Sequence, residues 1–555
     1  MRPSDYPPPW QNAEAIVAPS DPDPIEVGVL VVGAGPAGLA AAIRLGRLAA
    51  SDPETAQRLG ELPNVVLEKG KAPGSHLLSG AVIDPAPLHR LLEGLRAPED
   101  LPSYGPVPGE SVLFLTPGRA VPLPIPPTMR NHGNLVVSLS RLGRWLGEAA
   151  EEVGASILPE TAAEALLVED GRVVGVRTGA KGLGRNGERL GRFEPGSDIR
   201  AQVTILAEGT QGHLTTAALD RFGLGGGSPQ TWALGVKEVW KVPKPLRKVI
   251  HTMGWPLRSA ARFREFGGSF VYPMGDDMVT IGIVVGLDHR DAAISVHDLL
   301  QELKLHPRIR PIFEGGERIA WGAKTIPEGG FVALPRSLHA PGLLLTGDGA
   351  GMVNVPALKG IHYAVESGRL AADAAWGSLA PGGDLAAYDE ALRNSFIWRD
   401  LREVRNMRQA FGAGFWRGSA LAGLATVTKG RLPAGDRPTE LDADQTIFAT
   451  DRAATYPAPD GRLTFDKLSS VFLSGNKTRD DQPDHIRLAT TVPVELGELW
   501  SRMCPAQVYE VEPAAEGLVE VKVSPSNCVQ CGAITAKGGR LTPPEGGSGP
   551  EYTLT

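Results

Sequence analysis

The chain has few cysteines, no long apolar run and no excess of basic residues. Cysteine occurs three times in 555 residues, at Cys504, Cys528 and Cys531. An odd number that includes one Cys-x-x-Cys pair argues against a disulfide framework and indicates a metal site. No stretch of about 18 uncharged apolar residues is present, so we expect no transmembrane helix. The formal net charge of −7 leaves no basic surface, and we expect no nucleic-acid partner.

The sequence also lacks a targeting peptide. Residues 1–24 are rich in Pro and Asp, and they show neither the basic-then-apolar order of a signal peptide nor the Arg-rich character of a transit peptide. We therefore expect this segment to be a disordered leader. The whole chain is longer than one hydrophobic core usually supports, so two or three domains are expected.

Residues 27–69 have the order of a dinucleotide-binding βαβ unit. The apolar run Val27–Val32 is typical of a strand buried on both faces. The turn Gly33-Ala34-Gly35-Pro36-Ala37-Gly38 follows, and an Ala- and Leu-rich helix is predicted over residues 39–48. A second short strand, residues 64–69, ends in an acid. The pattern predicts nucleotide binding, and the alternative is an ordinary glycine-rich turn.

Each conspicuous residue of this unit has a physical reason. Gly33 permits the tight turn, Gly35 lets the backbone approach a pyrophosphate, and Gly38 lets helix and strand pack closely. The start of the helix offers free N–H groups and the positive end of its dipole to the phosphates. Glu68 ends the second strand, where a carboxylate accepts ribose hydroxyls. An insertion over residues 51–62 lengthens the spacing between the turn and this acid.

Two further strand ends lie far downstream in the chain. Residues 342–348 form an apolar strand that ends in Gly347-Asp348, and a helix is predicted from Gly360 to Ala374. Residues 203–209 form another strand that closes on glycine. An Asp at a strand end beside the start of a helix is placed to accept a ribityl hydroxyl. Three such strand ends favour FAD over NAD, because two-domain flavoproteins wrap one extended cofactor in this way.

The middle of the chain has a different pattern. Residues 231–330 contain alternating apolar segments, such as 233–239 and 278–287, and many aromatic side chains. This pattern predicts a mostly antiparallel sheet that faces the flavin and forms a substrate domain.

Several specific stretches resemble one family, the electron-transfer flavoprotein:ubiquinone oxidoreductases, from about residue 26 to residue 555. They are Gly-Ser-His-Leu-Leu-Ser-Gly-Ala (74–81), Asn-His-Gly-Asn (131–134), Gly-Trp-Pro-Leu (254–257), Gly-Gly-Ser-Phe (267–270), Asn-Val-Pro-Ala-Leu-Lys-Gly (354–360), Leu-Ser-Ser-Val (468–471) and Cys-Pro-Ala (504–506). The resemblance implies an α/β fold with a Rossmann-like FAD-binding domain of the two-dinucleotide-binding type (25–230 and 331–450). It further implies an antiparallel-sheet quinone-binding domain (231–330) and a ferredoxin-like iron–sulfur domain (451–555).

The resemblance implies electron transfer from a reduced electron-transfer flavoprotein to ubiquinone or another membrane quinone, through cofactors and without a catalytic nucleophile or base. The expected FAD-binding residues are Gly33, Gly35, Pro36, Ala37, Gly38, Glu68, Lys69, Ser79, Gly80, Gly347, Asp348 and Asn354. The family's quinone contacts correspond to Gly267 and Gly268, where paired glycines let a flat ring lie against the backbone. From the residues alone, a β-bulge is the alternative for this pair.

The expected iron–sulfur site departs from the family pattern at one position. Cys504, Cys528 and Cys531 match three of the four cysteines, but the fourth position holds Ile534. A [4Fe–4S] cluster normally takes four thiolates. Three outcomes stay open: a [4Fe–4S] cluster with one iron bound by water or an oxygen such as that of Thr535, a [3Fe–4S] cluster, or an empty site. Three buried cysteines that act as small hydrophobic side chains are the alternative.

The family is peripheral to a membrane, and two segments are candidates for that contact. Residues 79–95 place Leu88, Leu91, Leu92 and Leu95 at helical spacing, and residues 411–427 are apolar with Phe, Trp and nearby basic residues. A buried helix is the alternative for each. We expect a peripheral protein on the cytoplasmic face of a bacterial inner membrane. Alternatives for the whole chain are a geranylgeranyl-reductase-like or other flavin reductase of the same fold, and a non-catalytic flavin-bound scaffold at the membrane.

Overall fold

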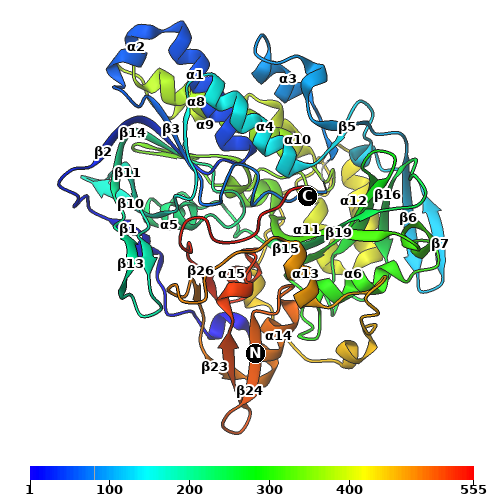
Figure 1. The fold of residues 1–555 in the computed structure, drawn as a ribbon. Coiled ribbons are helices and arrows are strands. Elements are labelled where there is room, and N and C mark those ends of the chain that lie inside the picture. Colours follow the sequence, from blue (N-terminus) through cyan, green and yellow to red (C-terminus); the bar gives the residue numbers. More distant parts are fainter. Residues whose placement is uncertain (81) are drawn as a thin grey trace.

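The computed structural model describes residues 1–80 and 82–555; Ala81, in one of the family-like stretches, lies outside the described residues. Figure 1 shows a parallel sheet covered by helices, an antiparallel sheet beside it, and a C-terminal part that lies against both. The architecture is of the α/β class with an antiparallel sheet that the sequence predicts.

A parallel sheet forms the core of the first part. Its strands run in the order β21–β14–β2–β3–β9, and every neighbouring pair is parallel. They are β2 (Ile25–Val32), β3 (Asn64–Leu67), β9 (Ser156–Leu158), β14 (Asp198–Leu206) and β21 (Leu343–Leu345). Helices α1 (Pro36–Ser51), α4 (Leu139–Glu152) and α8 (Ile361–Ser378) lie together over this sheet (Figure 1). The helices bury the strands, which explains the continuous apolar run in β2.

The N-terminal segment is folded, which corrects the expectation of a disordered leader. Strand β1 (Ile16–Val17) pairs in parallel with β10 (Ala163–Glu169), which continues the sheet through β11 (Arg172–Thr178). Ala15 is fully buried, and the carbonyl oxygen of Met1 accepts a hydrogen bond from the N–H of Ile447. The Pro and Asp content led to the wrong expectation, because backbone hydrogen bonds along a sheet edge can order a segment that has few apolar side chains.

The antiparallel sheet extends beyond residues 231–330. Its order is β19–β15–β18–β17–β16–β6–β7, and only the β16–β6 pair is parallel. The strands are β15 (Trp232–Lys241), β16 (Val249–Gly254), β17 (Gly267–Pro273), β18 (Met278–Gly286), β19 (Glu317–Pro327), β6 (Glu110–Thr116) and β7 (Arg119–Leu123). The last two come from within residues 25–230, so the predicted boundary missed a hairpin. On one face, α6 (Val296–Lys304) brings Lys304 to 2.7 Å from Glu238 of β15.

The C-terminal part packs against the antiparallel sheet and then returns to the first part. Its elements are α13 (Lys467–Leu473), α14 (Val494–Met503), α15 (Ala533–Ala536), β22 (Ile486–Arg487), β23 (Thr491–Pro493), β24 (Tyr509–Pro513), β25 (Leu518–Val523) and β26 (Arg540–Leu541). The carbonyl oxygen of Thr555 accepts a hydrogen bond from the N–H of Ser140 on α4, and the Thr555 hydroxyl donates to Leu77. Residues 551–555 therefore lie against α4 and against the loop of residues 74–80.

The remaining elements include one that corrects a membrane prediction. They are α2 (Pro53–Arg58), α3 (Ala86–Leu92), α5 (His213–Arg221), α7 (Arg310–Phe313), α9 (Ala387–Arg393), α10 (Phe396–Glu403), α11 (Met407–Ala410), α12 (Phe415–Val427), β4 (Val82–Ile83), β5 (Ser103–Pro106), β8 (Leu135–Val137), β12 (Lys181–Leu183), β13 (Arg189–Glu194) and β20 (His339–Ala340). Leu88, Leu91 and Leu92 of α3 are buried in the core rather than exposed, because α3 packs on α8. No helix among the described residues is long and apolar enough to cross a membrane.

Candidate functional site

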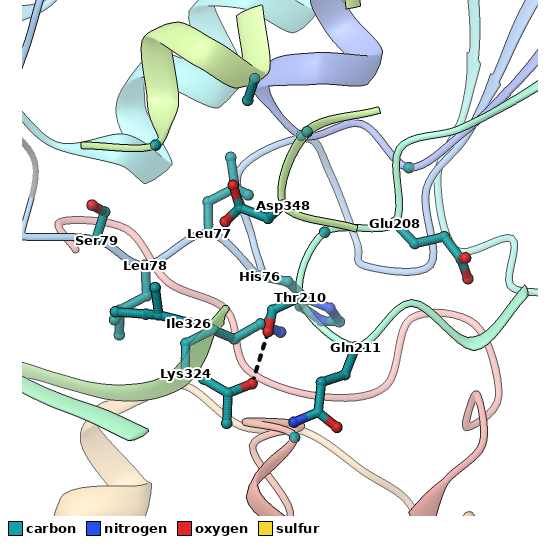
Figure 2. Close-up of a pocket in the computed structure, with 18 of the residues that line it drawn as sticks. His76, Leu77, Leu78, Ser79, Glu208, Thr210, Gln211, Lys324, Ile326 and Asp348 are labelled. Carbon is teal, nitrogen blue, oxygen red and sulfur yellow. Dashed lines mark hydrogen bonds between the residues drawn. The ribbon is translucent and has the colours of Figure 1, made fainter. Parts of the chain in front are cut away.

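One cavity of about 350 Å³ lies where the three parts of the chain meet. The parallel sheet contributes the turn after β2 and the ends of β3, β14 and β21, while β15, β17 and β19 form the facing wall. The C-terminal part contributes Gln530, Gly532 and Thr535. Figure 2 shows His76, Lys324 and Asp348 among the side chains around this space.

The predicted glycine turn forms one end of the cavity, and its backbone leaves no room for side chains at two positions. Gly33 has φ of +107°, and a Cβ there would lie 2.5 Å from the carbonyl oxygen of Ala207. A Cβ on Gly38 would lie 1.9 Å from the carbonyl oxygen of Gly33. At Gly35 the nearest atom is a Leu77 methyl at 3.7 Å, so this glycine keeps the approach to the helix N-terminus open rather than avoiding a clash.

Glu68 follows β3 and ties that strand to the glycine turn. Its Oε2 accepts a hydrogen bond from the N–H of Ala34 at 3.0 Å, and its Oε1 accepts one from Gly70 at 2.6 Å. Burial raises the pKa of the Glu68 carboxyl, while these N–H groups and the ammonium of Lys69 oppose that rise. Both residues line the cavity. A carboxylate fixed in this way is placed to accept further hydrogen bonds from ribose hydroxyls.

Asp348 lines the cavity beside the start of α8, as the sequence predicted. It follows β21, and Gly347 before it has φ of +59°. Burial raises the pKa of the Asp348 carboxyl to about 6. Helix α8 begins next to Gly360, which also lines the cavity, so the positive end of its dipole faces the same space.

Four of the residues predicted for the flavin or the quinone lie outside the set that lines the cavity: Gly38, Asn354, Gly267 and Gly268. Asn354 is buried, but its amide donates to the Tyr363 hydroxyl and accepts from the N–H of Ala357. Gly267 and Gly268 lie at the start of β17, whereas Phe270 and Tyr272 of the same strand line the cavity. Pro36, Ala37, Ser79 and Gly80 do line it. The expected flavin residues therefore converge, and the expected quinone residues lie further along the strand.

Three polar side chains that the sequence did not single out as site residues indicate that the cavity suits a polar ligand. Both side-chain polar atoms of Gln211 are buried without a hydrogen-bond partner, as are Nδ1 of His76 and Oε1 of Gln530. All three residues line the cavity. Buried polar groups are normally hydrogen-bonded, so these groups fit a ligand with donors and acceptors. His76 lies in a family-like stretch and Gln211 lies between Gly209 and Gly212, which were the only sequence signals. A dinucleotide therefore fits the residues present.

A second, smaller pocket of about 20 Å³ lies among the three cysteines. Cys504 follows α14, and Cys528 and Cys531 lie on the loop before α15. The Sγ atoms of Cys504 and Cys528 each accept a hydrogen bond from a backbone N–H at 3.4 Å. Burial raises the pKa of the Cys531 thiol to about 12. No three His, Cys, Asp or Glu side chains in residues 1–80 and 82–555 converge closely enough to bind a single metal ion. Three cysteines around an enclosed pocket with N–H···S contacts suit a larger cluster.

Ile534 occupies the position of the missing fourth cysteine. It lies on α15, is 2% exposed, and lines the cysteine pocket. Thr535, considered as an oxygen ligand, lines the large cavity instead, and its hydroxyl oxygen accepts a hydrogen bond from the N–H of Leu541 at 3.0 Å. The residues present therefore fit three-cysteine ligation and offer no fourth thiolate.

Hydrogen bonds connect the cysteine loop to the wall of the large cavity. The carbonyl oxygen of Cys531 accepts hydrogen bonds from the N–H and the hydroxyl of Thr325 on β19, both at 2.8 Å. The Thr325 hydroxyl is 2.9 Å from that of Thr210, which Figure 2 marks with a dashed line. Lys324 donates to the carbonyl oxygen of Gln530 at 3.0 Å. The two pockets are thus held rigidly side by side.

Two segments of the chain match family models of known proteins. Residues 232–326 match a family model described as "ETF-QO, ubiquinone-binding", and residues 461–553 match one described as "Electron transfer flavoprotein-ubiquinone oxidoreductase, 4Fe-4S". The mitochondrial electron transfer flavoprotein-ubiquinone oxidoreductase of Oryza sativa is 40% identical over 95% of this chain and 92% of its own length. The Homo sapiens protein of the same name is 37% identical over 95% of this chain and 89% of its own length.

Solved structures show the same fold at low identity. A geranylgeranyl bacteriochlorophyll reductase-like protein from Thermoplasma acidophilum superposes with a TM-score of 0.53, at 19% identity, over 76% of this chain and 92% of its own. A myxobacterial halogenase described as FAD-dependent gives a TM-score of 0.50 at 18% identity, over 76% of this chain and 95% of its own. These two likenesses show the fold of the chain, and the matching C-terminal model is one described by a 4Fe-4S cluster. The chain belongs to the electron transfer flavoprotein-ubiquinone oxidoreductase family.

Proposed function

We propose that this chain is an oxidoreductase that passes electrons from a reduced electron-transfer flavoprotein to ubiquinone or another membrane quinone. One observation carries the proposal: a single cavity is walled by the dinucleotide turn, by the segment that matches a ubiquinone-binding model, and by the cysteine loop. Gly33, Lys237 and Gln530 represent these three walls. Cofactors held at such a junction exchange electrons without diffusing, so the protein supplies position and tuning of potential.

The residues of the chain hold the dinucleotide at both ends. Backbone N–H groups at the start of α1 face the pyrophosphate, and Glu68 accepts ribose hydroxyls. Asp348 and the start of α8 lie where the ribityl chain and the flavin ring would sit. When bound, FAD supplies the electron-carrying chemistry. Residues of β15 and β17, which line the cavity, would shield the bound flavin from bulk water.

The quinone ring would lie against β17, on the far side of the flavin from the glycine turn. Phe270 and Tyr272 line the cavity, and the phenol of Tyr272 is 2.7 Å from Nε2 of His251. Gly267 and Gly268, the expected quinone contacts, continue the same strand toward Phe266 and Phe411, whose rings are 4.9 Å apart. An aromatic path of this kind suits an apolar quinone tail.

For the iron–sulfur site we propose a [3Fe–4S] cluster held by Cys504, Cys528 and Cys531. Among the described residues that line the cysteine pocket, no carboxylate, imidazole or further thiol is present, and Tyr509 carries the only side-chain oxygen. Ile534 fills the fourth position with buried apolar atoms, which disfavours water as a ligand to a corner iron.

Iron and sulfide content with low-temperature EPR tests the cluster type. A [3Fe–4S] cluster is paramagnetic when oxidised, whereas a [4Fe–4S] cluster of this class gives its signal when reduced. We expect the wild type and an Ile534→Val control to give the oxidised-state signal, and Ile534→Cys to move the signal to the reduced state. A wild-type signal found only after reduction, or protein without iron, contradicts the assignment.

We propose that α12 and the β6–β7 hairpin contact the membrane peripherally. Trp416 is 67% and Val427 84% exposed, and the Trp416 ring lies 5.4 Å from that of Phe114 on β6. The nearby Arg417 and Lys429 are exposed and suit anionic lipid headgroups. The side of the membrane, for which we expect the cytoplasmic face of a bacterial inner membrane, stays a prediction.

Sedimentation with anionic phospholipid vesicles tests this face. We expect Trp416→Ser with Val427→Ser to lower the bound fraction severalfold, because each removes apolar area from the contact. The matched control is Leu468→Ser with Phe472→Ser on α13, since Phe472 is 83% exposed on a different element. Equal losses in both double variants would contradict the assignment of the face.

Steady-state assays test the whole proposal against its alternatives. Purified holoprotein, supplied with reduced electron-transfer flavoprotein and a short-chain ubiquinone, should form quinol. If the chain were a flavin reductase of the geranylgeranyl-reductase type, the segment 461–553 that matches the 4Fe-4S model would have no role. If it were a non-catalytic scaffold, it would form no quinol in this assay. No quinol formation with the flavin intact contradicts the main proposal and favours the scaffold.

A further inference from the structure

Lys237 differs in its surroundings from every other deeply buried lysine. It lies in the middle of β15, is 1% exposed, and lines the large cavity. Its Nζ donates a hydrogen bond to the carbonyl oxygen of Ser79 at 2.7 Å. Burial alone lowers the pKa of Lys237, to about 7, with no contribution from a neighbouring charge. An ammonium in this position lacks the anion that normally offsets its loss of hydration.

The comparison with other lysines shows how unusual this is. Lys304, on the opposite side of the same sheet, lies 2.7 Å from the Glu238 carboxylate. In residues 1–80 and 82–555, the other fully buried lysines, Lys304 and Lys537, each have a carboxylate nearby. The partly buried lysines also have a carboxylate or a thiol nearby: Lys69, Lys324, Lys359 and Lys467. A protein that pairs its other buried lysines with anions leaves Lys237 without one at the cavity wall. An anion that arrives with the cofactor is the missing partner.

The two residues that pair with Lys237 in the sheet are glycines, so no side chain stands directly beside it on the adjacent strands. Its neighbours across the two adjacent strands are Gly282 on β18 and Gly322 on β19. The ring of Phe270 and the side chain of Leu78 fill the space over these glycines. The other ionisable side chains on this cavity wall are Lys324, opposite Gly235, Tyr272 on β17, and Glu328 just after β19, whose carboxylate lies 2.7 Å from the guanidinium of Arg408. The remaining carboxylates that line the cavity come from the other wall: Glu68, Glu208 and Asp348.

We propose that Lys237 is a positioning residue that balances the negative charge which enters this cavity when the bound flavin is reduced. The inference rests on the proposed function only in that FAD occupies the cavity. Each electron that reaches the flavin, whatever its source, adds one negative charge there. The amine of Lys237 gains one proton from water and becomes an ammonium, so that one N–H bond forms and no bond to carbon changes. A positive charge near the ring favours the reduced cofactor.

A purely structural role is the competing explanation, because the Lys237–Ser79 hydrogen bond also fixes the loop of residues 77–80. Glutamine separates the two roles. Its amide N–H donates a hydrogen bond as lysine does, but it carries no charge. Arginine keeps the charge, and methionine removes both the charge and the donor while filling a similar volume.

Mediated redox titration of the purified holoprotein tests the inference without a protein donor or a quinone. We expect Lys237→Met and Lys237→Gln both to lower the flavin midpoint potential, by a shift equal to about tenfold in the ratio of reduced to oxidised flavin. Lys237→Arg should retain most of the wild-type potential. The matched control is Lys241→Met, on the same strand but exposed, which should change nothing. FAD content and thermal unfolding are measured on each variant.

Each result of the redox titration either supports or overturns the inference about Lys237. A potential near the wild-type value in Lys237→Gln, with loss only in Lys237→Met, shows a tether and overturns the inference. An unchanged potential in both also overturns it. If Lys237→Met does not retain FAD, the Gln and Arg pair still decides, because the two differ in charge and both donate hydrogen bonds. Failure of quinol formation in wild-type protein with a normal potential shift in the variants counts against the proposed function alone.

Discussion

The large cavity has a volume of about 350 Å³ and is lined by polar and apolar residues from three parts of the chain, whereas the cysteine pocket has a volume of about 20 Å³ and is lined by sulfur and mostly apolar side chains. The two share Gly532 and Leu541, which line both. The cavity is specified mainly by backbone geometry: at Gly33 and Gly38 a single methyl group would strike a carbonyl oxygen. The pocket is specified by the chemistry of a few side chains.

This difference explains why the two sites tolerate change differently. Ile534 stands where the family pattern has its fourth cysteine, and its side chain is buried there among apolar atoms. No comparable exchange is open to Gly38, because the clash there is with the main chain. A site built from side chains changes its chemistry through one substitution, while a site built from backbone geometry loses the local fold.

The largest expected effect comes from a matched pair in the glycine turn. Gly38→Ala places a methyl group 1.9 Å from the carbonyl oxygen of Gly33 and should destabilise the protein by more than about 3 kcal/mol, with loss of FAD. Gly35→Ala meets nothing closer than 3.7 Å, so it should fold and bind FAD more weakly. Thermal unfolding and bound FAD measure both. Equal stability of the two variants would break the distinction between backbone and side-chain specification.

Cys528→Ser is the equivalent test on the other side of the comparison. We expect iron and sulfide to fall nearly to zero, because a three-cysteine site has no ligand to spare. FAD content should stay close to that of the wild type, since Cys528 does not line the large cavity. Iron analysis and the flavin absorbance spectrum measure the two cofactors separately. Joint loss of both cofactors would show that the pockets are not independent.

Mild acid should affect the flavin cavity before the cysteine pocket. Burial lowers the pKa of His213 to about 3 and holds that of His76 well below its usual value, and both residues line the cavity. Each is neutral in the folded protein and protonates on unfolding, so its stabilisation is present above pH 6.5 and is lost as pH falls toward 3. One such histidine costs up to about 1.4 kcal/mol per pH unit in that range. FAD fluorescence during a titration from pH 7 to 5 should report release before iron is lost, and the reverse order would contradict this reasoning.

The smallest expected effect concerns Thr535, which lies between the two pockets. Thr535→Val removes the acceptor of the hydrogen bond from the N–H of Leu541 and should cost about 1 kcal/mol in the free energy of unfolding. Iron content and the EPR spectrum should not change, because the hydroxyl lines the cavity rather than the cysteine pocket. A fall in iron would identify Thr535 as a ligand and blur the boundary between the sites.

Sequence reasoning found the cavity where local pattern and function coincide. Gly33, Glu68 and Asp348 lie at strand ends, and strand ends of a parallel sheet meet at one edge, so their convergence followed from the order of elements. Lys237 carries no local signal and Gln211 only that of the glycines beside it, because their surroundings depend on strands and loops that meet only in the folded chain. The sequence left open whether Leu88 on α3 is buried, since helical spacing does not reveal whether an apolar face meets lipid or α8.

The contact of residues 551–555 with α4 and with the loop of residues 74–80 affects the order in which the protein can fold during synthesis. A ribosome delivers α1 and the loop of residues 74–80 long before it delivers Tyr552 and Thr555, whose main-chain groups bond to Arg144 and Ser140 of α4. Nascent chains released before residue 551 would contain the whole glycine turn but would lack the hydrogen bonds of Tyr552 and Thr555 to α4. Cofactor loading should therefore follow synthesis of this last segment, and intermediates arrested before it should remain colourless in the visible range.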